Sequence, residues 1–394
     1  MSESWVETLR AQFPVTRNTA FFDIAYENCG STFVRETMER FFDHKADVHP
    51  GLVKAGGAGK GDTIGVIAQA RQRLADFLHA PSIKSLAFTA NTCQAMNLLL
   101  QGFPFRPGDN VVVGDMEHVS VLMPCLQLKQ KGVECRVVPS PDGVTLPAEK
   151  LLERTDEHTR IMAVSYVQSR SGYKVDLAML ARECHKRSIF LITDAIQALG
   201  FQQVDVQALG VDALAASGYK GLLATEGLGF LYCGDKLLEQ LSPVFAGDSP
   251  ALTVDRERWE IRCTDPLDAR KLEAGTIPFQ SIYGLNAALG RLMEIGMDRV
   301  EAHVCQCFEQ VYRGLEELGY SIATPFDPRQ RCHSMMVATP RNREMVDFCL
   351  ERGVFFSRSV EGYVRISVAP FTTQADIDAL LRAAAAWREQ EGGR

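Results

Sequence analysis

The sequence predicts an α/β protein in which a central, mostly parallel sheet carries helices on both faces, with a smaller α+β part beside it. Short apolar runs alternate with amphipathic segments through the middle of the chain, and this pattern is typical of repeated βαβ units. The 394 residues suffice for one large core and a smaller one. Apolar residues make up 46% and charged residues 23%, as in ordinary globular proteins.

The expected elements follow one another closely in the middle of the chain. A helix is expected after the third strand because Leu177, Leu180, Ala181 and Cys184 fall at i, i+3, i+4 and i+7 on one face. Each strand is read from a short apolar run. In chain order we expect strand 85–89, helix 92–101, strand 110–114, helix 120–131, strand 161–167, the helix near 177, and strands 189–193, 213–216 and 229–233.

The two ends of the chain have a different pattern. A long helical pattern covers about Ser281–Leu318, short strands follow, and a final helix is expected over Thr373–Gln390. We therefore expect a large domain of residues 19–284 and a small domain of residues 1–18 and 285–394. The glycine-rich segment Gly51–Gly61 lacks the spacing of a phosphate loop, so we expect a surface loop or an active-site loop there.

Composition excludes several classes of function. The net charge is −7 and no dense Lys/Arg stripe is present, so nucleic acid is not an expected partner. No stretch approaches the length of a membrane span, and the first residues lack an apolar signal core. The eleven cysteines form no CxxC pair, which favours reduced thiols in a cytoplasmic protein over a disulfide framework or a metal site.

Polar side chains follow each of the consecutive strands. Because the carboxyl ends of parallel strands meet at one edge of a sheet, where ligands bind, one shared site explains them better than unrelated loops. In strand order these residues are Asn91, Thr92 and Cys93, then Glu117 and His118, then Gln168 and Ser169, then Asp194 and Gln197, and finally Ser217, Tyr219 and Lys220.

Lys220 and Asp194 indicate the chemistry of that site. Asp194 ends the apolar run from Ile189, and Lys220 follows the turn after the next strand. Pyridoxal phosphate chemistry requires this pair: the lysine forms a Schiff base with the cofactor aldehyde, and the carboxylate keeps the pyridine nitrogen protonated. Taken singly, they could be a surface lysine and a helix-capping aspartate.

The remaining groups at the sheet edge fit parts of the same cofactor. Thr92 and Cys93 open a helix, whose backbone N–H groups suit a phosphate, although an ordinary helix cap is the alternative. His118 can stack on the ring and move protons, or it can be structural. A hydrogen bond to the ring oxygen can come from any of three polar side chains, namely Gln168, Ser169 and Gln197.

Substrate contacts are expected from outside this edge. Arg365 lies on an expected strand, Tyr363–Ser367, with Arg358 seven residues earlier. An inward-facing arginine binds a carboxylate in planar, bidentate fashion, whereas edge-strand arginines facing solvent are the alternative. Tyr26 and Asn28 are expected in the substrate pocket from their position alone.

Several motifs occur together in the order found in one family. These are the segments 89–97, 116–118, 167–173, 194–197, 217–220, 226–232 and 271–276, followed by Arg365 and the helix start Asp376-Ile-Asp378. Together they resemble the class V aminotransferase superfamily, which includes cysteine desulfurases, selenocysteine lyases and isopenicillin N epimerase-like proteins. The resemblance covers most of the chain.

The resemblance implies the fold of fold type I pyridoxal phosphate enzymes, with the cofactor in the large domain and with Lys220, His118 and Asp194 as catalytic residues. It also implies a homodimer, because the segment with Gly275 and Thr276 is similar to one that reaches the partner subunit's cofactor phosphate. It further implies that the sheet-edge residues given above, apart from Glu117, bind the cofactor together with Gly275 and Thr276.

Two departures from the family pattern limit what can be transferred. The loop 357–363 before the arginine strand has no cysteine, whereas desulfurases carry a nucleophilic cysteine there, and Cys332 is the other thiol to consider. Tyr219 stands where many members have histidine. We therefore expect an enzyme that acts on an L-amino acid through the lysine Schiff base and a quinonoid, most simply a C–S lyase by β-elimination. An aminotransferase, an epimerase and a non-catalytic pyridoxal phosphate-binding regulator stay as alternatives.

Overall fold

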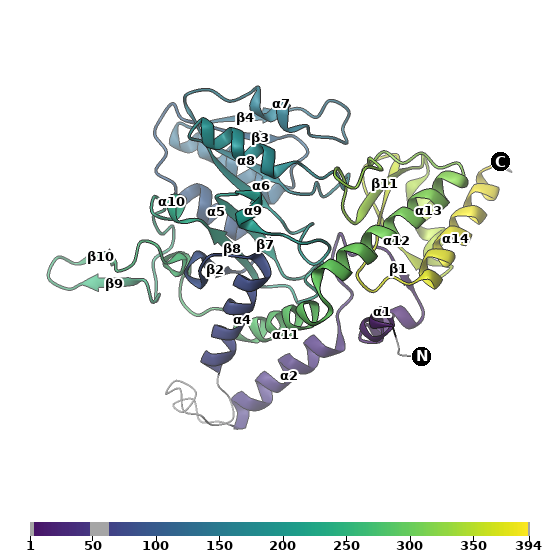
Figure 1. Ribbon diagram of the computed structural model, residues 1–394, viewed down its shortest axis with the longest axis horizontal. Coiled ribbons are helices and arrows are strands. Elements are labelled where there is room, and N and C mark those ends of the chain that lie inside the picture. Colours follow the sequence, from purple (N-terminus) through teal and green to yellow (C-terminus); the bar gives the residue numbers. More distant parts are fainter. Residues whose placement is uncertain (1–3, 48–62, 393–394) are drawn as a thin grey trace.

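The computed structural model describes residues 4–47 and 63–392, and a seven-stranded sheet in the order β2-β8-β7-β6-β5-β3-β4 lies at its centre (Figure 1). The expected segment Gly51–Gly61 lies outside the described residues. Within the sheet, β8 is antiparallel to both neighbours and the other pairs are parallel, so the expected mostly parallel sheet is confirmed. The strands are β2 (Leu86–Thr89), β3 (Asn110–Gly114), β4 (Glu134–Val138), β5 (Thr159–Ser165), β6 (Phe190–Asp194), β7 (Ala213–Ser217) and β8 (Gly229–Cys233).

Helices cover both faces of this sheet, because successive strand residues point to opposite sides. Val111 and Val113 of β3 belong to one buried cluster with residues of α5 and α6, whereas Val112 belongs to a second cluster with residues of α8. All three valines are fully buried, which explains why the strands read as continuous apolar runs. The helices in this part of the chain are α4 (Thr63–Leu78), α5 (Thr92–Gly102), α6 (Val119–Gln127), α7 (Ala148–Leu152), α8 (Leu177–Lys186), α9 (Val206–Leu209) and α10 (Asp235–Leu238).

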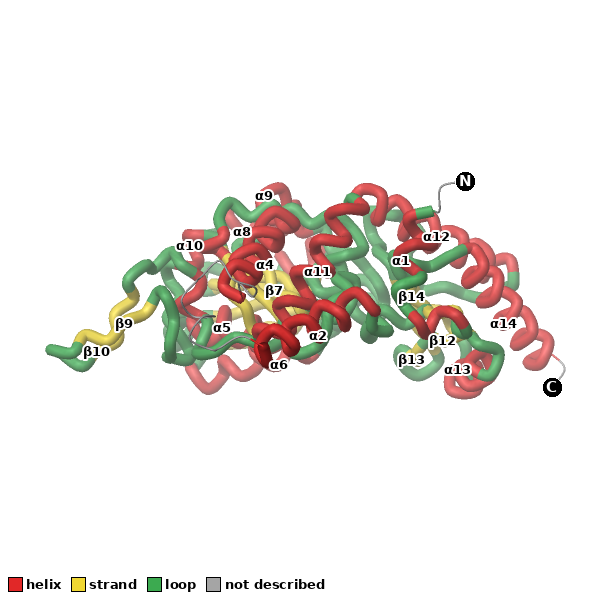
Figure 2. The backbone as a smooth tube through the Cα atoms, turned by 90° about the horizontal axis from the view of Figure 1, so that it is seen from below, coloured by secondary structure: helices red, strands yellow, loops and turns green. Residues whose placement is uncertain are grey.

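A three-stranded antiparallel sheet in the order β11-β14-β13 lies at one end of the molecule, beside α13 and α14 (Figure 2). A hairpin of β9 (Leu252–Asp255) and β10 (Glu260–Cys263) projects from the opposite end (Figure 2). The small-sheet strands are β11 (Ser334–Ala338), β13 (Ser357–Arg358) and β14 (Tyr363–Ser367). The remaining helices are α1 (Trp5–Arg10), α2 (Thr32–Asp47), α11 (Phe279–Ile295), α12 (Met297–Glu317), α13 (Asn342–Leu350) and α14 (Gln374–Gly392).

Residues beyond the expected boundary at residue 19 still pack on the small-sheet side of the molecule. The strand β1 (Ala20–Phe21) pairs with β12 (Val354–Phe355), and Asp23 forms a bridge with Ser367 at the end of β14. The expected large-domain boundary at residue 19 therefore precedes residues that pair with the small-domain side, and the boundary at residue 284 falls inside α11. The division into two domains itself stays a prediction.

Two of the differences from the sequence expectation have a simple physical reason. The single helix expected over Ser281–Leu318 is two helices, α11 and α12, because Gly296 between them has φ = 92°, which helical residues do not adopt. Strand β4 was not expected, since it is an edge strand and most of its side chains are partly exposed. Among the described residues, none of the helices combines the length and apolar character that a membrane crossing demands.

Candidate cofactor and active site

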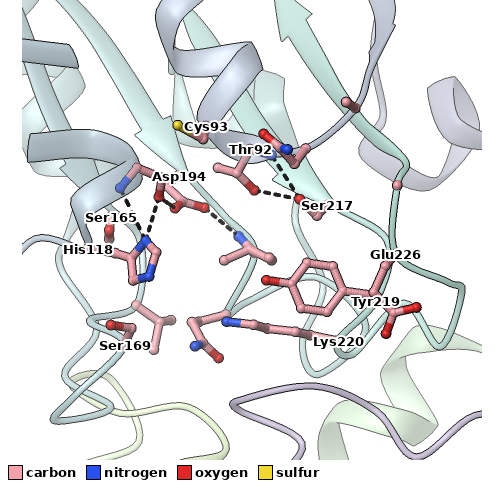
Figure 3. Close-up of a pocket in the computed structure, with 17 residues that line it drawn as sticks. Thr92, Cys93, His118, Ser165, Ser169, Asp194, Ser217, Tyr219, Lys220 and Glu226 are labelled. Atoms are coloured by element: carbon pink, nitrogen blue, oxygen red, sulfur yellow. Dashed lines mark hydrogen bonds between the residues drawn. The ribbon is translucent and has the colours of Figure 1, made fainter. Parts of the chain in front are cut away.

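A cavity of about 300 Å³ lies at the carboxyl edge of the central sheet, where we expected a shared site (Figure 3). Every strand end that we singled out contributes at least one lining residue to this cavity. The expected residues that line it are Asn91, Thr92, Cys93, His118, Ser169, Asp194, Gln197, Ser217, Tyr219 and Lys220. Lining residues that we did not expect include Ser120, Ser165 and Glu226.

One end of the cavity is formed by the start of α5. Asn91 caps the helix by accepting from the Gln94 N–H at 2.9 Å, which fixes the first turn against the end of β2. The Thr92 N–H donates to the Ser217 hydroxyl at 2.8 Å, and the two hydroxyls are 3.0 Å apart (Figure 3). A helix start with two convergent hydroxyls is suited to an anion such as a phosphate.

Gly229 allows this helix start to approach the sheet. A Cβ atom at Gly229 would lie 2.7 Å from the Cα and carbonyl carbon of Asn91, and 2.8 Å from the oxygen of Ala216. These are main-chain atoms, so a larger residue would push α5 away from β8. The glycine therefore allows the short distance between the start of α5 and the sheet.

Asp194 presents a buried carboxylate at the end of β6. Its side chain is 3% exposed; Oδ1 accepts from the Ile196 N–H at 2.9 Å, and the Ser120 hydroxyl lies 3.5 Å from Oδ2. Burial raises the pKa of Asp194 to about 6, against the lowering effects of the Ile196 N–H and the Lys220 charge. Within the described ranges no lysine or arginine forms an ion pair with it, so the cavity side of this carboxylate is open to a cation.

Lys220 reaches the same cavity from the turn after β7. The residue is 7% exposed. Its amine makes no hydrogen bond or ion pair with the described part of the chain. Its Nζ lies 5.8 Å from the ring centre of Tyr219. Burial lowers the pKa of Lys220 to about 8, as does Arg365, while Asp194 and Asp23 oppose this shift. The amine is therefore more readily neutral, and hence nucleophilic, than an ordinary lysine.

His118 lies at the cavity wall as the N-cap of α6. The Ser120 N–H donates to its Nδ1 at 3.2 Å, so in the neutral ring the proton belongs on Nε2. Burial lowers the pKa of His118, and Lys220, Arg170 and Arg365 add to the effect. The neighbouring Glu117 is buried and accepts from Ser165 and, at 2.7 Å, from the Gln168 amide. Burial raises its pKa to about 7.

The three candidates for the ring-oxygen hydrogen bond have different surroundings. Gln168 does not line the cavity; its amide is directed to Glu117 instead, and we correct its expected role accordingly. Gln197 lines the cavity, donates to the Ala25 carbonyl at 2.9 Å, and leaves its Oε1 buried without a partner among the described residues. Ser169 lines the cavity and its carbonyl accepts from Arg365. Of the three, Gln197 and Ser169 remain positioned to contact a ligand.

Arg365 projects from β14 toward this cavity. Its Nη1 donates to the Ser169 carbonyl at 2.7 Å, and its Nη2 lies 3.7 Å from Asp23 Oδ1. Its Nε and Asp23 Oδ1 are both buried and have no hydrogen-bond partner in the described part of the chain. Burial lowers the pKa of Arg365, and Asp23 opposes the change. Sequence reasoning missed Asp23, although an acid inside the apolar run Phe21–Ile24 was a signal for a buried ion pair.

The other expected substrate and partner residues lie elsewhere. Asn28 is a correction: its amide donates at 2.8 Å to the carbonyls of Tyr219 and of Ala224, so it supports the lysine turn rather than a substrate. Tyr26 and Arg358 line a second, neighbouring cavity. Gly275 and Thr276 are exposed and do not line the cavity of their own chain.

The cavity fits the cofactor that the sequence indicates. The buried Asp194 carboxylate forms no ion pair among the described residues, so a protonated ring nitrogen could pair with it, and the α5 start offers N–H and hydroxyl groups for a phosphate. Lys220, whose amine has no hydrogen bond or ion pair among the described residues, lines the same cavity. The donor set thus matches an anionic aromatic aldehyde with a basic ring nitrogen.

Comparison with known proteins agrees with this geometry. The family model for class V aminotransferases matches residues 31–380. A probable cysteine desulfurase from Methanothermobacter thermautotrophicus is 30% identical over 311 residues, which are 78% of this chain and 74% of that protein. The crystal structure of the cysteine desulfurase CsdA from Escherichia coli is similar with a TM-score of 0.84 at 26% identity, over 98% of both chains. A variant of C-DES with glycine linked to its pyridoxal phosphate shares the fold, with a TM-score of 0.83 at 21% identity, over 95% of this chain and 98% of that one.

Proposed function

The chain belongs to the class V aminotransferase family of pyridoxal phosphate-dependent enzymes, and we propose that it is a lyase that removes a sulfur substituent from Cβ of an L-amino acid. The observation that carries this proposal is a cavity lined by Lys220, Asp194 and the start of α5, together with a loop of residues 357–363 that contains no cysteine. When bound, the cofactor supplies an aldehyde that condenses with amines and a ring that accepts the electron pair released at Cα.

The cofactor would be held at three places. The start of α5 with Thr92 and Ser217 would bind its phosphate, and Asp194 would hold the protonated ring nitrogen through a buried ion pair. Lys220 would provide the amine to which it is attached in the resting enzyme. His118 would stack on the ring from the cavity wall, held in position by Ser120.

The chain's own residues would then divide the work on the substrate. Arg365 would bind the α-carboxylate, because its buried Nε has no hydrogen-bond partner among the described residues. The Lys220 amine, once released, would take the proton from Cα; its lowered pKa of about 8 gives it a larger neutral fraction near physiological pH than an ordinary lysine has. The proton on His118 Nε2 would be available to the departing sulfur.

A persulfide-forming route needs a reactive thiol beside the substrate, and the two candidate cysteines fit it poorly. Cys332 is 6% exposed, and burial raises the pKa of its thiol to about 12, which keeps it protonated. Cys93 is exposed and lines the cavity, but it lies on the first turn of α5 at the phosphate-binding end. An elimination that leaves no sulfur on the protein is the simpler reaction for this cavity.

The products of L-cysteine and its S-substituted forms test this proposal. A lyase gives pyruvate, ammonia and a thiol or sulfide, whereas a desulfurase gives alanine and a protein-bound persulfide. An aminotransferase gives a keto acid together with the pyridoxamine form of the cofactor. Pyruvate formation that persists in Cys93→Ser and Cys332→Ser would support the lyase. Alanine without pyruvate would defeat it.

We also infer that the enzyme acts as a homodimer with shared sites. Gly275 and Thr276 are exposed and do not line the cofactor cavity of their own chain, as expected if they serve a partner subunit's cofactor phosphate. Sedimentation of the cofactor-loaded protein measures its mass directly. A monomer with full activity would exclude shared sites.

A further inference from the structure

A second cavity of about 740 Å³ lies next to the cofactor cavity, and five arginines line it: Arg170, Arg341, Arg343, Arg358 and Arg365. Arg365 belongs to the wall between the two cavities, because it lines the second one and donates to the carbonyl of Ser169, which lines the first. A ligand whose carboxylate is held by Arg365 could therefore extend into the second cavity.

The charges in this second cavity do not cancel. Arg341 pairs with Glu344, and Arg365 faces Asp23. Arg170, Arg343 and Arg358 form no ion pair within the part of the chain that the structure describes, and Glu361 is the other acidic lining residue. The whole chain has a net charge of −7, so this positive surplus is local rather than a property of the surface at large.

The arginines come from three separate segments that hydrogen bonds hold together. The Asn342 amide donates to the carbonyls of Val360 at 2.9 Å and of Tyr363 at 3.1 Å, which ties the start of α13 to the loop after Arg358. The Ser359 hydroxyl lies 3.5 Å from the Arg170 carbonyl, which joins that loop to the segment after β5. These bonds hold the three segments together, and the exposed side chains of Arg170, Arg343 and Arg358 line the same cavity. Guanidinium groups favour planar anions such as carboxylates, which they bind bidentately.

We propose that the substrate carries a second acidic group at the far end of its side chain, and that Arg170, Arg343 and Arg358 bind it. This inference rests on the proposed function, in which Arg365 holds the α-carboxylate. For a C–S lyase the matching substrate class is an S-substituted L-cysteine whose sulfur substituent ends in a carboxylate. The leaving thiol would then take the acidic group away with it.

A pair of nearly isosteric ligands tests the proposal. S-carboxymethyl-L-cysteine ends in a carboxylate, and S-carbamoylmethyl-L-cysteine ends in an amide of nearly the same shape. Their dissociation constants are measured by calorimetry on cofactor-loaded protein that has been reduced with borohydride, so that no turnover contributes heat. We expect the acid to bind about tenfold or more tightly than the amide, a ratio typical of a charge-assisted contact. The preference should fall with rising salt.

Variants test which arginines cause the preference for the acidic ligand. Arg343→Gln and Arg358→Gln should each reduce the preference for the acid, whereas Arg182→Gln, an exposed arginine on α8 away from both cavities, should leave it unchanged. Equal affinities for the two ligands, or equal loss in the Arg182→Gln control, would overturn the proposal. Cofactor that washes out after reduction would instead show that the proposed function fails, because Lys220 would not have been linked to it.

Discussion

The guanidinium of Arg365 donates a 2.7 Å hydrogen bond to the carbonyl of Ser169, which joins the small sheet to the loop that follows β5 of the central sheet. The same guanidinium faces the buried Asp23 at 3.7 Å. One side chain thus connects the amino-terminal segment, the small sheet and the cofactor cavity, and its Nε is still without a partner among the described residues.

Replacing Arg365 tests whether this free capacity binds the substrate carboxylate. Arg365→Lys keeps the charge but loses the planar fork, so we expect kcat/KM to fall about 10- to 100-fold, mostly through KM. In Arg365→Gln, kcat/KM should fall further, because this change also leaves Asp23 unpaired. Steady-state kinetics on the substrate identified by product analysis gives the measurement. Unchanged KM in both variants would place the carboxylate elsewhere.

Asp194 should matter for catalysis through its charge. Asp194→Asn keeps the shape and the hydrogen bond from Ile196 but removes the negative charge that would pair with the cofactor's ring nitrogen. We expect kcat to fall about 10²–10³-fold, the usual effect of losing one preorganised electrostatic contact. Asp194→Glu serves as the charge-preserving comparison and should retain more activity. Equal activity of the asparagine variant and the wild type would contradict the role of the charge.

The same residue should give the cofactor-free protein a recognisable pH dependence. Burial raises the pKa of Asp194 to about 6, above its ordinary value near 4. The folded state therefore holds this proton more tightly than the unfolded state, and the carboxyl lowers stability as pH rises from about 4 to 6. Cofactor-free Asp194→Asn should be more stable than the wild type at pH 8, on the order of 1–3 kcal/mol.

This difference should shrink at pH 5, where the folded wild type is largely protonated at Asp194. Urea unfolding at both pH values measures it. A difference that does not change with pH would show that the charge of Asp194 has no part in it.

Gly229 offers a test of the phosphate-binding end that does not alter a polar group. In Gly229→Ala the added Cβ would meet Asn91 main-chain atoms at 2.7 Å, so we expect a loss of about 1–3 kcal/mol in stability and weaker cofactor binding. Gly234→Ala is the matched control, since its Cβ would meet its nearest neighbour at 3.4 Å, an ordinary contact. Equal cofactor affinity in the two variants would show that the close approach of α5 is dispensable.

Much of the central sheet could be predicted because its strands are buried on both faces. Strands β3 and β8 begin and end at the expected residues, and their apolar runs contrast sharply with the flanking glycine and polar residues. Strand β4 was missed because an edge strand with half-exposed side chains lacks that contrast. The break between α11 and α12 was missed because one glycine in a long apolar periodicity is a weak signal.

Site residues that lie at strand ends could be predicted from the order of the strands. Site residues that come together through contacts between distant parts of the chain could not. Thr92, Asp194, Ser217 and Lys220 stand at or just after the ends of β2, β6 and β7, and the rule that parallel strands end at one edge brings them together. Asp23 is paired with Arg365 through the return of the amino-terminal segment to the small sheet, which local patterns do not reveal. The inward direction of the Asn28 and Gln168 amides also depends on tertiary contacts.

The identity of the cofactor-bearing lysine is the most direct test. Borohydride reduction of the cofactor-loaded protein, followed by peptide mapping, should place the pyridoxyl group on Lys220, and Lys220→Ala should carry no tag and lack the visible absorbance of the loaded enzyme. A tag on another lysine, such as the buried Lys271, or a loaded protein without any tag, would contradict the account.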